Sequence, residues 1–215
     1  MPPARPAVTV TYAQSLDGCL AAAPGRPLTL SGPEALRYTH QLRAAHAAIL
    51  VGLGTVLADN PRLTVRHAAG PNPQPILLDS QLRCPPDAAL LQHPTHTLWI
   101  AARADAPTER RAALESAGAR VLALPAEADG RVDLGALLDA LGAAGLTTLM
   151  VEGGARVITA FLKQRLAQRL IVTVAPRLVG GVPAVAAPLD LALRDVQYRR
   201  LGQDLIVEAQ LPAVP

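Results

Sequence analysis

Short hydrophobic runs alternate along most of the chain with longer segments of mixed character. The short runs are rich in Val, Ile and Leu and predict strands at residues 8–12, 47–51, 76–78, 98–101, 120–123, 149–151 and 170–174. The longer segments predict helices at residues 31–45, 108–118 and 133–145, and a further helix through Val157, Ile158, Phe161 and Leu162. Residues 196–201 and 205–209 flank Gly202-Gln203-Asp204 and predict a C-terminal hairpin.

Polar residues mark the expected starts of three helices. Ser31 and Glu34 have the spacing of a capping box, in which each side chain binds a free amide of the first turn. Thr108 and Asp133 are expected to cap the next two helices. Strands that alternate with helices are typical of an α/β fold with a mainly parallel sheet covered on both faces. The C-terminal hairpin adds antiparallel strands, and one domain over residues 1–215 is the simplest interpretation.

Two predicted strands run into helices through glycine-rich junctions. Residues 51–55 (VGLGT) carry the first two glycines of a dinucleotide fingerprint, with Leu57 where the third would stand. Residues 152–155 (EGGA) form the second junction. Ligands of open α/β sheets bind at the carboxyl ends of strands, where free helix amides suit phosphate. Either junction alone could be a tight turn, but two in one sheet favour a nucleotide site.

Composition excludes several classes of function. Half of the 215 residues are hydrophobic but only 2% are aromatic, which argues against a stacking platform for single-stranded nucleic acid. Lys163 is the only lysine, so a Schiff-base mechanism has a single candidate. Cys19 and Cys84 are expected to be reduced thiols of a cytoplasmic protein. No apolar stretch is long enough to span a membrane, and residues 1–6 lack the hydrophobic segment of a signal peptide.

Isolated charged residues leave alternatives open. Arg43 and Arg66 could be surface charges, or together a clamp for phosphate. Asp17 and Asp59 are expected in loops, where turn-forming acids are common. We expect no metal at the pair His93-x-x-His96, because no third ligand is near it in the sequence.

The order of several short motifs carries a family resemblance. The motifs are AQSLDG at 13–18, SGPE at 31–34, LRA at 42–44, AILVGLGTVLADNPRLTVR at 48–66, ILLDS at 76–80, VEGGA at 151–155, and Pro176 with Gly180-Gly181. The chain resembles the reductase domain of riboflavin biosynthesis, which is the C-terminal half of the bifunctional deaminase–reductase and exists also as stand-alone relatives. The resemblance spans nearly the whole chain.

This resemblance implies a fold and a reaction. The fold would be a dihydrofolate-reductase-like three-layer sandwich, usually as a homodimer. The reaction would be the NADPH-dependent reduction of a phosphoribosylamino-pyrimidine to the ribitylamino compound. The ribose opens to an imine at C1′ within the substrate, and hydride from the nicotinamide then attacks that carbon. No enzyme lysine is needed, so most of the catalysis would be positioning and exclusion of water.

The resemblance also implies roles for individual residues. The cofactor side would comprise Ala13, Gly52, Gly54, Thr55, Asp59, Ser80, Arg83, Gly153, Gly154, Ala155, Arg156 and Val157. Ser80 and Arg83 would lie at the adenosine end, and the residues from Gly154 on would bind the pyrophosphate. The substrate side would comprise Arg26, Arg43, Leu63, Arg66 and Glu152. The candidate catalytic residues are Glu152 and Asp17; Asp17 matches a family motif but has no assigned proton-transfer role.

One part of the chain departs from the family pattern. Many bifunctional members carry Ser and Trp where this chain has Arg26 and Leu28, and loss of the Trp removes a stacking surface near the cofactor. Two alternatives therefore stay open beside the pyrimidine reductase. One is a paralogous NADPH reductase of another small molecule. The other is a non-catalytic nucleotide-binding domain, against which Arg43, Arg66 and Glu152 argue by their presence.

Overall fold

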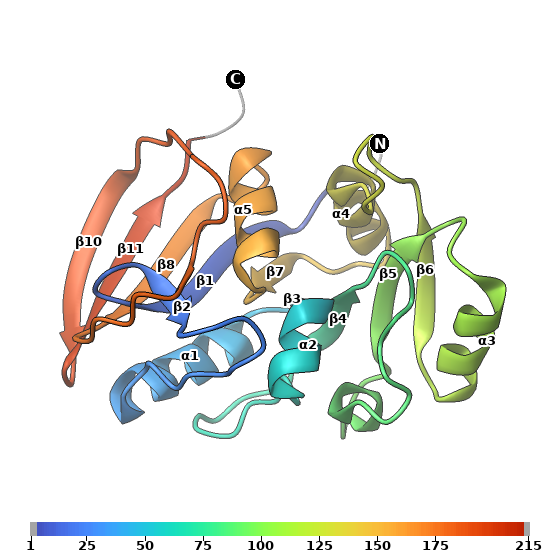
Figure 1. The fold of residues 1–215 in the computed structure, drawn as a ribbon, viewed down its shortest axis with the longest axis horizontal. Helices are drawn as coiled ribbons and strands as arrows, with labels where there is room; N and C mark the ends of the chain where they lie inside the picture. The colour runs from blue at the N-terminus through green and yellow to red at the C-terminus, as the bar shows by residue number, and fades with distance from the viewer. Residues whose placement is uncertain (1–3, 213–215) are drawn as a thin grey trace.

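A computed structural model describes residues 4–212 of the chain (Figure 1). Nine strands form one sheet in the order β10-β11-β8-β1-β7-β3-β4-β5-β6. Their bounds are β1 Ala7–Ser15, β3 Ala48–Gly52, β4 Gln74–Leu78, β5 Trp99–Arg103, β6 Arg120–Leu124, β7 Thr148–Val151, β8 Arg169–Ala175, β10 Arg194–Leu201 and β11 Asp204–Gln210. All pairs from β8 through β6 are parallel, and only β8–β11 and β10–β11 are antiparallel. The predicted sheet is confirmed.

Helices cover both faces of the sheet. Their bounds are α1 Pro33–Ala45, α2 Leu53–Asp59, α3 Thr108–Ser116, α4 Leu134–Ala143 and α5 Ala155–Lys163, with a short 3-10 helix at Ala89–Gln92. Along β7 the side chains alternate, so that Leu149 and Val151 pack with α4 and α5 while Met150 packs with α1. On β3, Ile49 and Val51 pack with α2 and α3. The result is the predicted three-layer sandwich.

Two helix starts differ from the predicted caps. The predicted capping box is wrong, because α1 begins at Pro33 after Gly32, and no side chain of the local motif caps it. Asp204, at the start of β11, instead accepts the Gly32 N–H at 2.7 Å. The predicted Thr108 cap is also wrong, since Thr108 is the first helical residue. The Asp133 cap is confirmed, with its Oδ1 accepting the Ala136 N–H at 3.0 Å.

A second, small sheet was not predicted. It pairs β2 (Cys19–Ala21) with β9 (Val182–Pro183) and so joins the turn after β1 to the segment after β8. The expected loop position of Asp59 is wrong, because Asp59 is the last residue of α2. Cys19 and Cys84 are buried and form no disulfide within the described residues.

The sequence predicts neither a membrane-spanning segment nor a signal peptide. Within residues 4–212, no helix combines the length and the apolar character that a membrane crossing requires. The expected lack of a signal peptide concerns residues 1–6, of which residues 1–3 lie outside the described part.

Candidate active site at the carboxyl ends of β3 and β7

The two glycine-rich junctions lie side by side in the fold. β7 is inserted between β1 and β3, although it begins only at Thr148, far behind both in the chain. β3 leads through Gly52 into α2, and β7 leads through Glu152 to Gly154 into α5. A Cβ atom on Gly154 would lie 3.4 Å from the Thr55 hydroxyl, so the first turns of the two helices approach each other. Their free amides therefore face one region.

The four glycines of these junctions divide into two kinds. A Cβ on Gly52 would come within 2.7 Å of Val157, and one on Gly153 within 2.6 Å of the same side chain. These two glycines let α5 pack closely on the sheet. A Cβ on Gly54 would meet no heavy atom within 4 Å, and one on Gly154 would meet only Thr55. The backbone is therefore accessible at Gly54 and Gly154, the positions where a phosphate could approach it.

Strand β1 offers unpaired backbone groups beside the same junction. β1 pairs with β7 only from Ala7 to Val10, but it runs on to Ser15 beside β8. The Ala7 N–H points to the β7 side and the Val8 carbonyl to the β8 side, as two hydrogen bonds show. Because this direction alternates along a strand, the backbone of Ala13 faces the β7 side, beyond the end of β7. Ala13 can therefore bind a ligand through its backbone.

An arginine–glutamate pair lies at the end of β7. Arg43, in the last turn of α1, donates from Nε to Glu152 Oε1 at 2.7 Å and from Nη2 to Oε2 at 2.7 Å. Its Nη1 donates to the Thr64 carbonyl at 3.1 Å. Burial opposes the charge of Arg43, but the adjacent Glu152 carboxylate outweighs it and raises the pKa of Arg43. The pair is nearly enclosed, with 12% and 15% of the two side chains exposed.

Arg66 brings a second positive charge to this cluster. Its Nη1 donates to the Thr64 hydroxyl at 2.9 Å, and within residues 4–212 it forms no ion pair. Desolvation, followed by the charges of Arg43 and Arg62, lowers the pKa of Arg66. Leu63 is buried with a left-handed φ of 54° and turns the chain between Arg62 and Thr64. The structure thus brings Arg43, Arg66 and Glu152 together, while the Leu63 side chain packs in the core with α2 and α3.

Asp17 lies in the turn after β1 and is held as an acceptor. Its carboxylate accepts the Ser15 hydroxyl at 2.5 Å and the amides of Val179 at 3.0 Å and Gly180 at 2.6 Å. The Ser15 hydroxyl, and then these amides, lower the pKa of Asp17 to about 2. An ionised, fully engaged carboxylate anchors the segment after β8 and has no proton to donate at neutral pH.

The remaining predicted residues lie farther from the arginine–glutamate pair. Ser80 follows β4, two strands from β7, and its hydroxyl accepts the Val132 N–H at 3.2 Å. Arg83 lines a hollow of about 370 Å³ between the segment 82–86 and α3. Arg156 is exposed in the first turn of α5. Arg26 is exposed on the loop before α1, and no side-chain contact in the described chain links it to Arg43 or Glu152.

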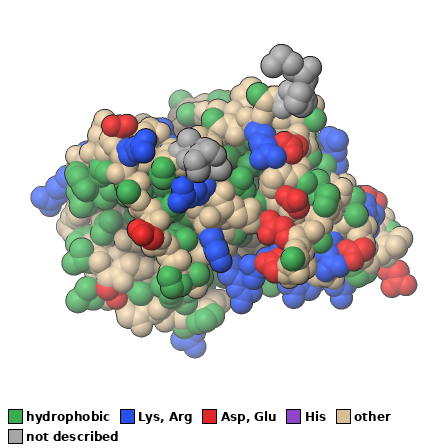
Figure 2. Space-filling view, turned by 90° about the horizontal axis from the view of Figure 1, so that it is seen from above, with side chains coloured by type: hydrophobic (Ala, Val, Ile, Leu, Met, Phe, Trp, Pro, Cys, Tyr) green, Lys and Arg blue, Asp and Glu red, His purple; other side chains and the backbone are tan. Residues whose placement is uncertain are grey.

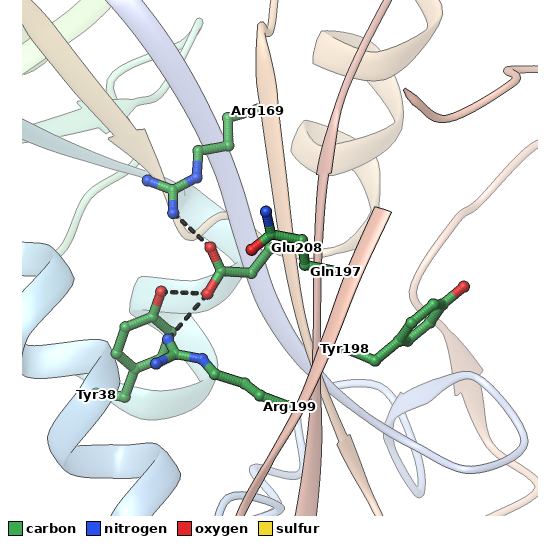
Figure 3. A pocket seen from close by; sticks show the side chains of 6 residues that line it. All are labelled: Tyr38, Arg169, Gln197, Tyr198, Arg199 and Glu208. Atoms are coloured by element: carbon green, nitrogen blue, oxygen red, sulfur yellow. Dashed lines mark hydrogen bonds and ion pairs between the residues drawn. The ribbon is translucent and has the colours of Figure 1, made fainter. Parts of the chain in front are cut away.

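A second charged cluster lies between α1 and the C-terminal hairpin (Figure 3). Glu208 on β11 accepts from the Tyr38 hydroxyl at 2.7 Å, from Arg169 at 2.5 Å and from Arg199 at 2.9 Å. The Arg199 guanidinium also lies 4.0 Å from the centre of the Tyr38 ring. Burial, followed by the Glu208 carboxylate, raises the pKa of Tyr38 to about 12. The adjoining hollow measures about 300 Å³, and this network attaches α1 to the hairpin.

Comparison with known proteins assigns the family. A family model described as the RibD C-terminal domain matches residues 6–207. The chain belongs to this family. It is 38% identical to the 2,5-diamino-6-ribosylamino-4(3H)-pyrimidinone 5′-phosphate reductase of Methanothermobacter thermautotrophicus, over 95% of this chain and 97% of the relative. It is 32% identical to the Saccharomyces cerevisiae reductase of the same name, over 96% and 87% of the two chains.

Solved structures agree with this assignment. Acinetobacter baumannii RibD superposes with a TM-score of 0.81 at 25% identity, over 97% of this chain and 58% of that one. The S. cerevisiae riboflavin biosynthesis reductase Rib7 superposes with a TM-score of 0.79 at 28% identity, over 97% and 90%. Enterococcus faecalis dihydrofolate reductase, at 12% identity and a TM-score of 0.53, shares the fold. The predicted dihydrofolate-reductase-like fold is confirmed.

Sequence reasoning missed two residues of the cluster around Arg43 and Arg66. Thr64 links Arg43 to Arg66 through its carbonyl and its hydroxyl, although only its neighbours had been singled out. His40 is buried beside both arginines and had not been considered. Its position one turn before Arg43 on the same helix was the available signal.

Proposed function

We propose that this protein is an NADPH-dependent reductase that converts a 5-phosphoribosylamino-pyrimidine to the ribitylamino-pyrimidine in riboflavin biosynthesis. The observation that carries the proposal is the enclosed Arg43–Glu152 pair, which lies at the end of β7 between two glycine-rich helix starts. Relatives at 32–38% identity over nearly the whole chain are named as reductases of this substrate class. Family and site geometry support the same activity.

The residues present fit a dinucleotide cofactor. Gly54 and Gly154 leave space against the backbone, and neither α2 nor α5 has a side-chain cap on its first amides. We propose that these amides, with Thr55, hold the pyrophosphate, and that Ala13 holds the nicotinamide through its backbone. Ser80 and Arg83 would bind the adenosine end. NADPH would supply the hydride that reduces C1′ of the substrate imine.

On the substrate side, Arg66 has no carboxylate partner among the described residues, and we propose that its positive charge binds the phosphate. Arg43 holds Glu152 by two hydrogen bonds, so the Glu152 carboxylate is fixed at the end of β7, where it would face the pyrimidine or ribose. Leu63 shapes the loop that presents Arg66. Arg26 would reach the substrate only from its exposed loop.

For the two candidate catalytic acids we propose different roles. Glu152 would contact the reacting part of the substrate. Asp17 would act as a positioning residue, because its three hydrogen bonds and its pKa of about 2 keep it ionised and engaged. The imine forms from the substrate's own ribose, so Lys163 has no part in the reaction. The main task of the site would then be to exclude water from C1′ of the substrate.

We also propose a homodimer that works in the cytoplasm. Hydrophobic side chains gather over the end of the molecule that carries the C-terminal hairpin, whereas charges of both signs mix over the opposite end (Figure 2). In the segment after β8 and in the C-terminal hairpin, Leu178, Tyr198 and Leu205 are exposed by 77%, 67% and 41%. Exposed apolar side chains favour contact with a second copy. The two free buried cysteines suit a reducing compartment.

The activity is tested by the loss of NADPH absorbance with the phosphoribosylamino-pyrimidine, in its amino and deaminated forms. We expect turnover of one form. The mass of the product, two hydrogens heavier than the substrate, identifies the reaction. Turnover of neither form, with NADPH binding intact, contradicts this function and favours the paralogous reductase. Failure to bind NADPH as well contradicts the cofactor assignment. A larger rise of the melting midpoint with NADPH than with NADH supports Ser80 and Arg83 at the adenosine end.

A further inference from the structure

His40 is a buried histidine that belongs to none of the roles assigned so far. It lies on α1, one turn before Arg43, and its side chain is fully buried. Its Nδ1 accepts the backbone N–H of Arg66 at 3.0 Å. Its Nε2 has no hydrogen-bond partner in the described chain. An acceptor at Nδ1 means that the neutral ring carries its proton on Nε2.

The surroundings of the ring favour the neutral form. Burial, followed by the charges of Arg43 and Arg66, lowers the pKa of His40 to about 4. The ring of His67 stands nearly perpendicular to it, with centroids 4.7 Å apart, and adds to this effect. Glu152 favours the charged form of the ring, but this carboxylate is already paired with Arg43. At neutral pH the ring is therefore an uncharged acceptor toward Arg66.

In the loop between α2 and β4, the backbone of three consecutive residues is held by side chains and not by strand pairing. Arg43 binds the Thr64 carbonyl, the Asn72 side chain binds the Val65 amide at 2.8 Å, and His40 binds the Arg66 amide. Arg66 is thus the last anchored residue before the turn at 67–70. Without the His40 acceptor, the backbone amide of Arg66 would be unpaired. The Arg66 backbone would then no longer be held in place, and the position of the guanidinium would be less well defined.

We propose that His40 is the positioning residue that directs Arg66 toward the phosphate of the substrate. This inference rests on the proposed function. It differs from a packing role, because packing needs only the volume of the ring, whereas positioning needs an acceptor at Nδ1. The free Nε2–H is a donor enclosed next to the same anion site, and a substrate oxygen or a bridging water would pair it when the site fills.

Two substitutions of His40 distinguish the effect of its Nδ1 acceptor from the effect of its ring volume. His40→Leu keeps an apolar side chain of similar size and removes the acceptor. His40→Asn places Oδ1 where Nδ1 lies and keeps it. We expect His40→Leu to raise KM for the phosphorylated substrate by about tenfold, the effect of one lost hydrogen bond, with kcat within about twofold. With the dephosphorylated substrate, His40→Leu should resemble the wild type, and His40→Asn should resemble the wild type with both.

The same loss of activity on both substrates, or an equal defect in both variants, would overturn the inference and leave a packing role. Wild-type protein without any turnover would refute the proposed function instead. A second measurement then still decides the inference: nitrogen NMR of the wild type, in which His40 should be the Nε2–H tautomer. Titration with inorganic phosphate should shift the Arg66 amide in the wild type and in His40→Asn. An Nδ1–H tautomer, or an Arg66 amide indifferent to phosphate, overturns the assignment.

Discussion

Helix α1 touches two arginine–carboxylate clusters that are built differently. In the first, Glu152 is bound by Arg43 alone, and Arg66 nearby has no ion-pair partner within residues 4–212. In the second, Arg169, Arg199 and Tyr38 all donate to Glu208, so each of its arginines contacts the carboxylate (Figure 3). An arginine without a carboxylate contact is available to bind an anionic ligand, whereas arginines that share one carboxylate attach two elements to each other. We therefore assign chemistry to the first and architecture to the second.

The sharpest contrast should come from removing the two carboxylate charges. Glu152→Gln is expected to lower kcat/KM at least about a hundredfold, because it removes the charge that we propose faces the substrate and leaves Arg43 enclosed and unpaired. The matched variant Glu208→Gln should change kcat/KM by less than about threefold. Both should lower the free energy of unfolding by about 2 kcal/mol. Steady-state kinetics and urea unfolding of the two proteins measure this. Equal losses of activity would remove the distinction between the clusters.

Two arginines provide the next comparison. Arg66→Ala should raise KM for the phosphorylated substrate by about tenfold or more and leave NADPH affinity unchanged, since its charge is assigned to the substrate phosphate. Arg199→Ala should leave both constants near their wild-type values. Substrate kinetics together with NADPH fluorescence titration test this. An equal loss of NADPH affinity in Arg66→Ala would move this arginine to the cofactor.

Substitutions at the two kinds of junction glycine should separate an effect on folding from an effect on cofactor binding. Gly153→Ala places a methyl group within 2.6 Å of Val157 and should lower the free energy of unfolding by about 2 kcal/mol. Gly54→Ala meets nothing within 4 Å of the new methyl group, so it should fold normally and raise KM for NADPH several-fold. Thermal melting and NADPH kinetics distinguish the two. If Gly54→Ala has normal NADPH kinetics, the cofactor does not approach that backbone.

The smallest expected effect is a difference in pH dependence. The pKa of His40 falls from an ordinary 6.5 to about 4, so its contribution to stability is complete above about pH 6.5 and is lost as the pH falls toward 4. The pKa of Tyr38 rises from 10 to about 12, so its contribution is complete below pH 10 and is lost as the pH rises toward 12. Urea unfolding across this range should show His40→Asn flattening only the acid limb and Tyr38→Phe only the alkaline limb. A change of the opposite limb in either variant would mean that the wrong group had been assigned.

Local pattern was enough to predict most of the fold. Short apolar runs located the strands, helical spacing and cap residues located the longer helices, and the Asp133 cap was visible because its partner is three residues away. The capping box failed because the group that binds Gly32 is Asp204, at the other end of the chain. No local pattern contains such a contact.

The roles of the candidate site residues stay predictions, but the fold shows how these residues pair. The family resemblance named Arg43, Arg66 and Glu152, yet the bidentate pair joins residues 109 positions apart and appears only in the fold. The same holds for Asp17, whose two backbone partners lie at 179 and 180. The division of the glycines into packing and accessible positions depends on where Val157 falls, and sequence spacing could not supply it.

The most direct test of the account is a crystal structure with NADP⁺ and the ribitylamino-pyrimidine phosphate. We predict the phosphate at Arg66, the pyrimidine or ribityl chain at Glu152, and the pyrophosphate of the cofactor at the first turns of α2 and α5. The hollow beside Tyr38 and Glu208 should contain no ligand. A pyrimidine bound in that hollow, or a phosphate away from Arg66, would contradict the assignment of chemistry to the first cluster.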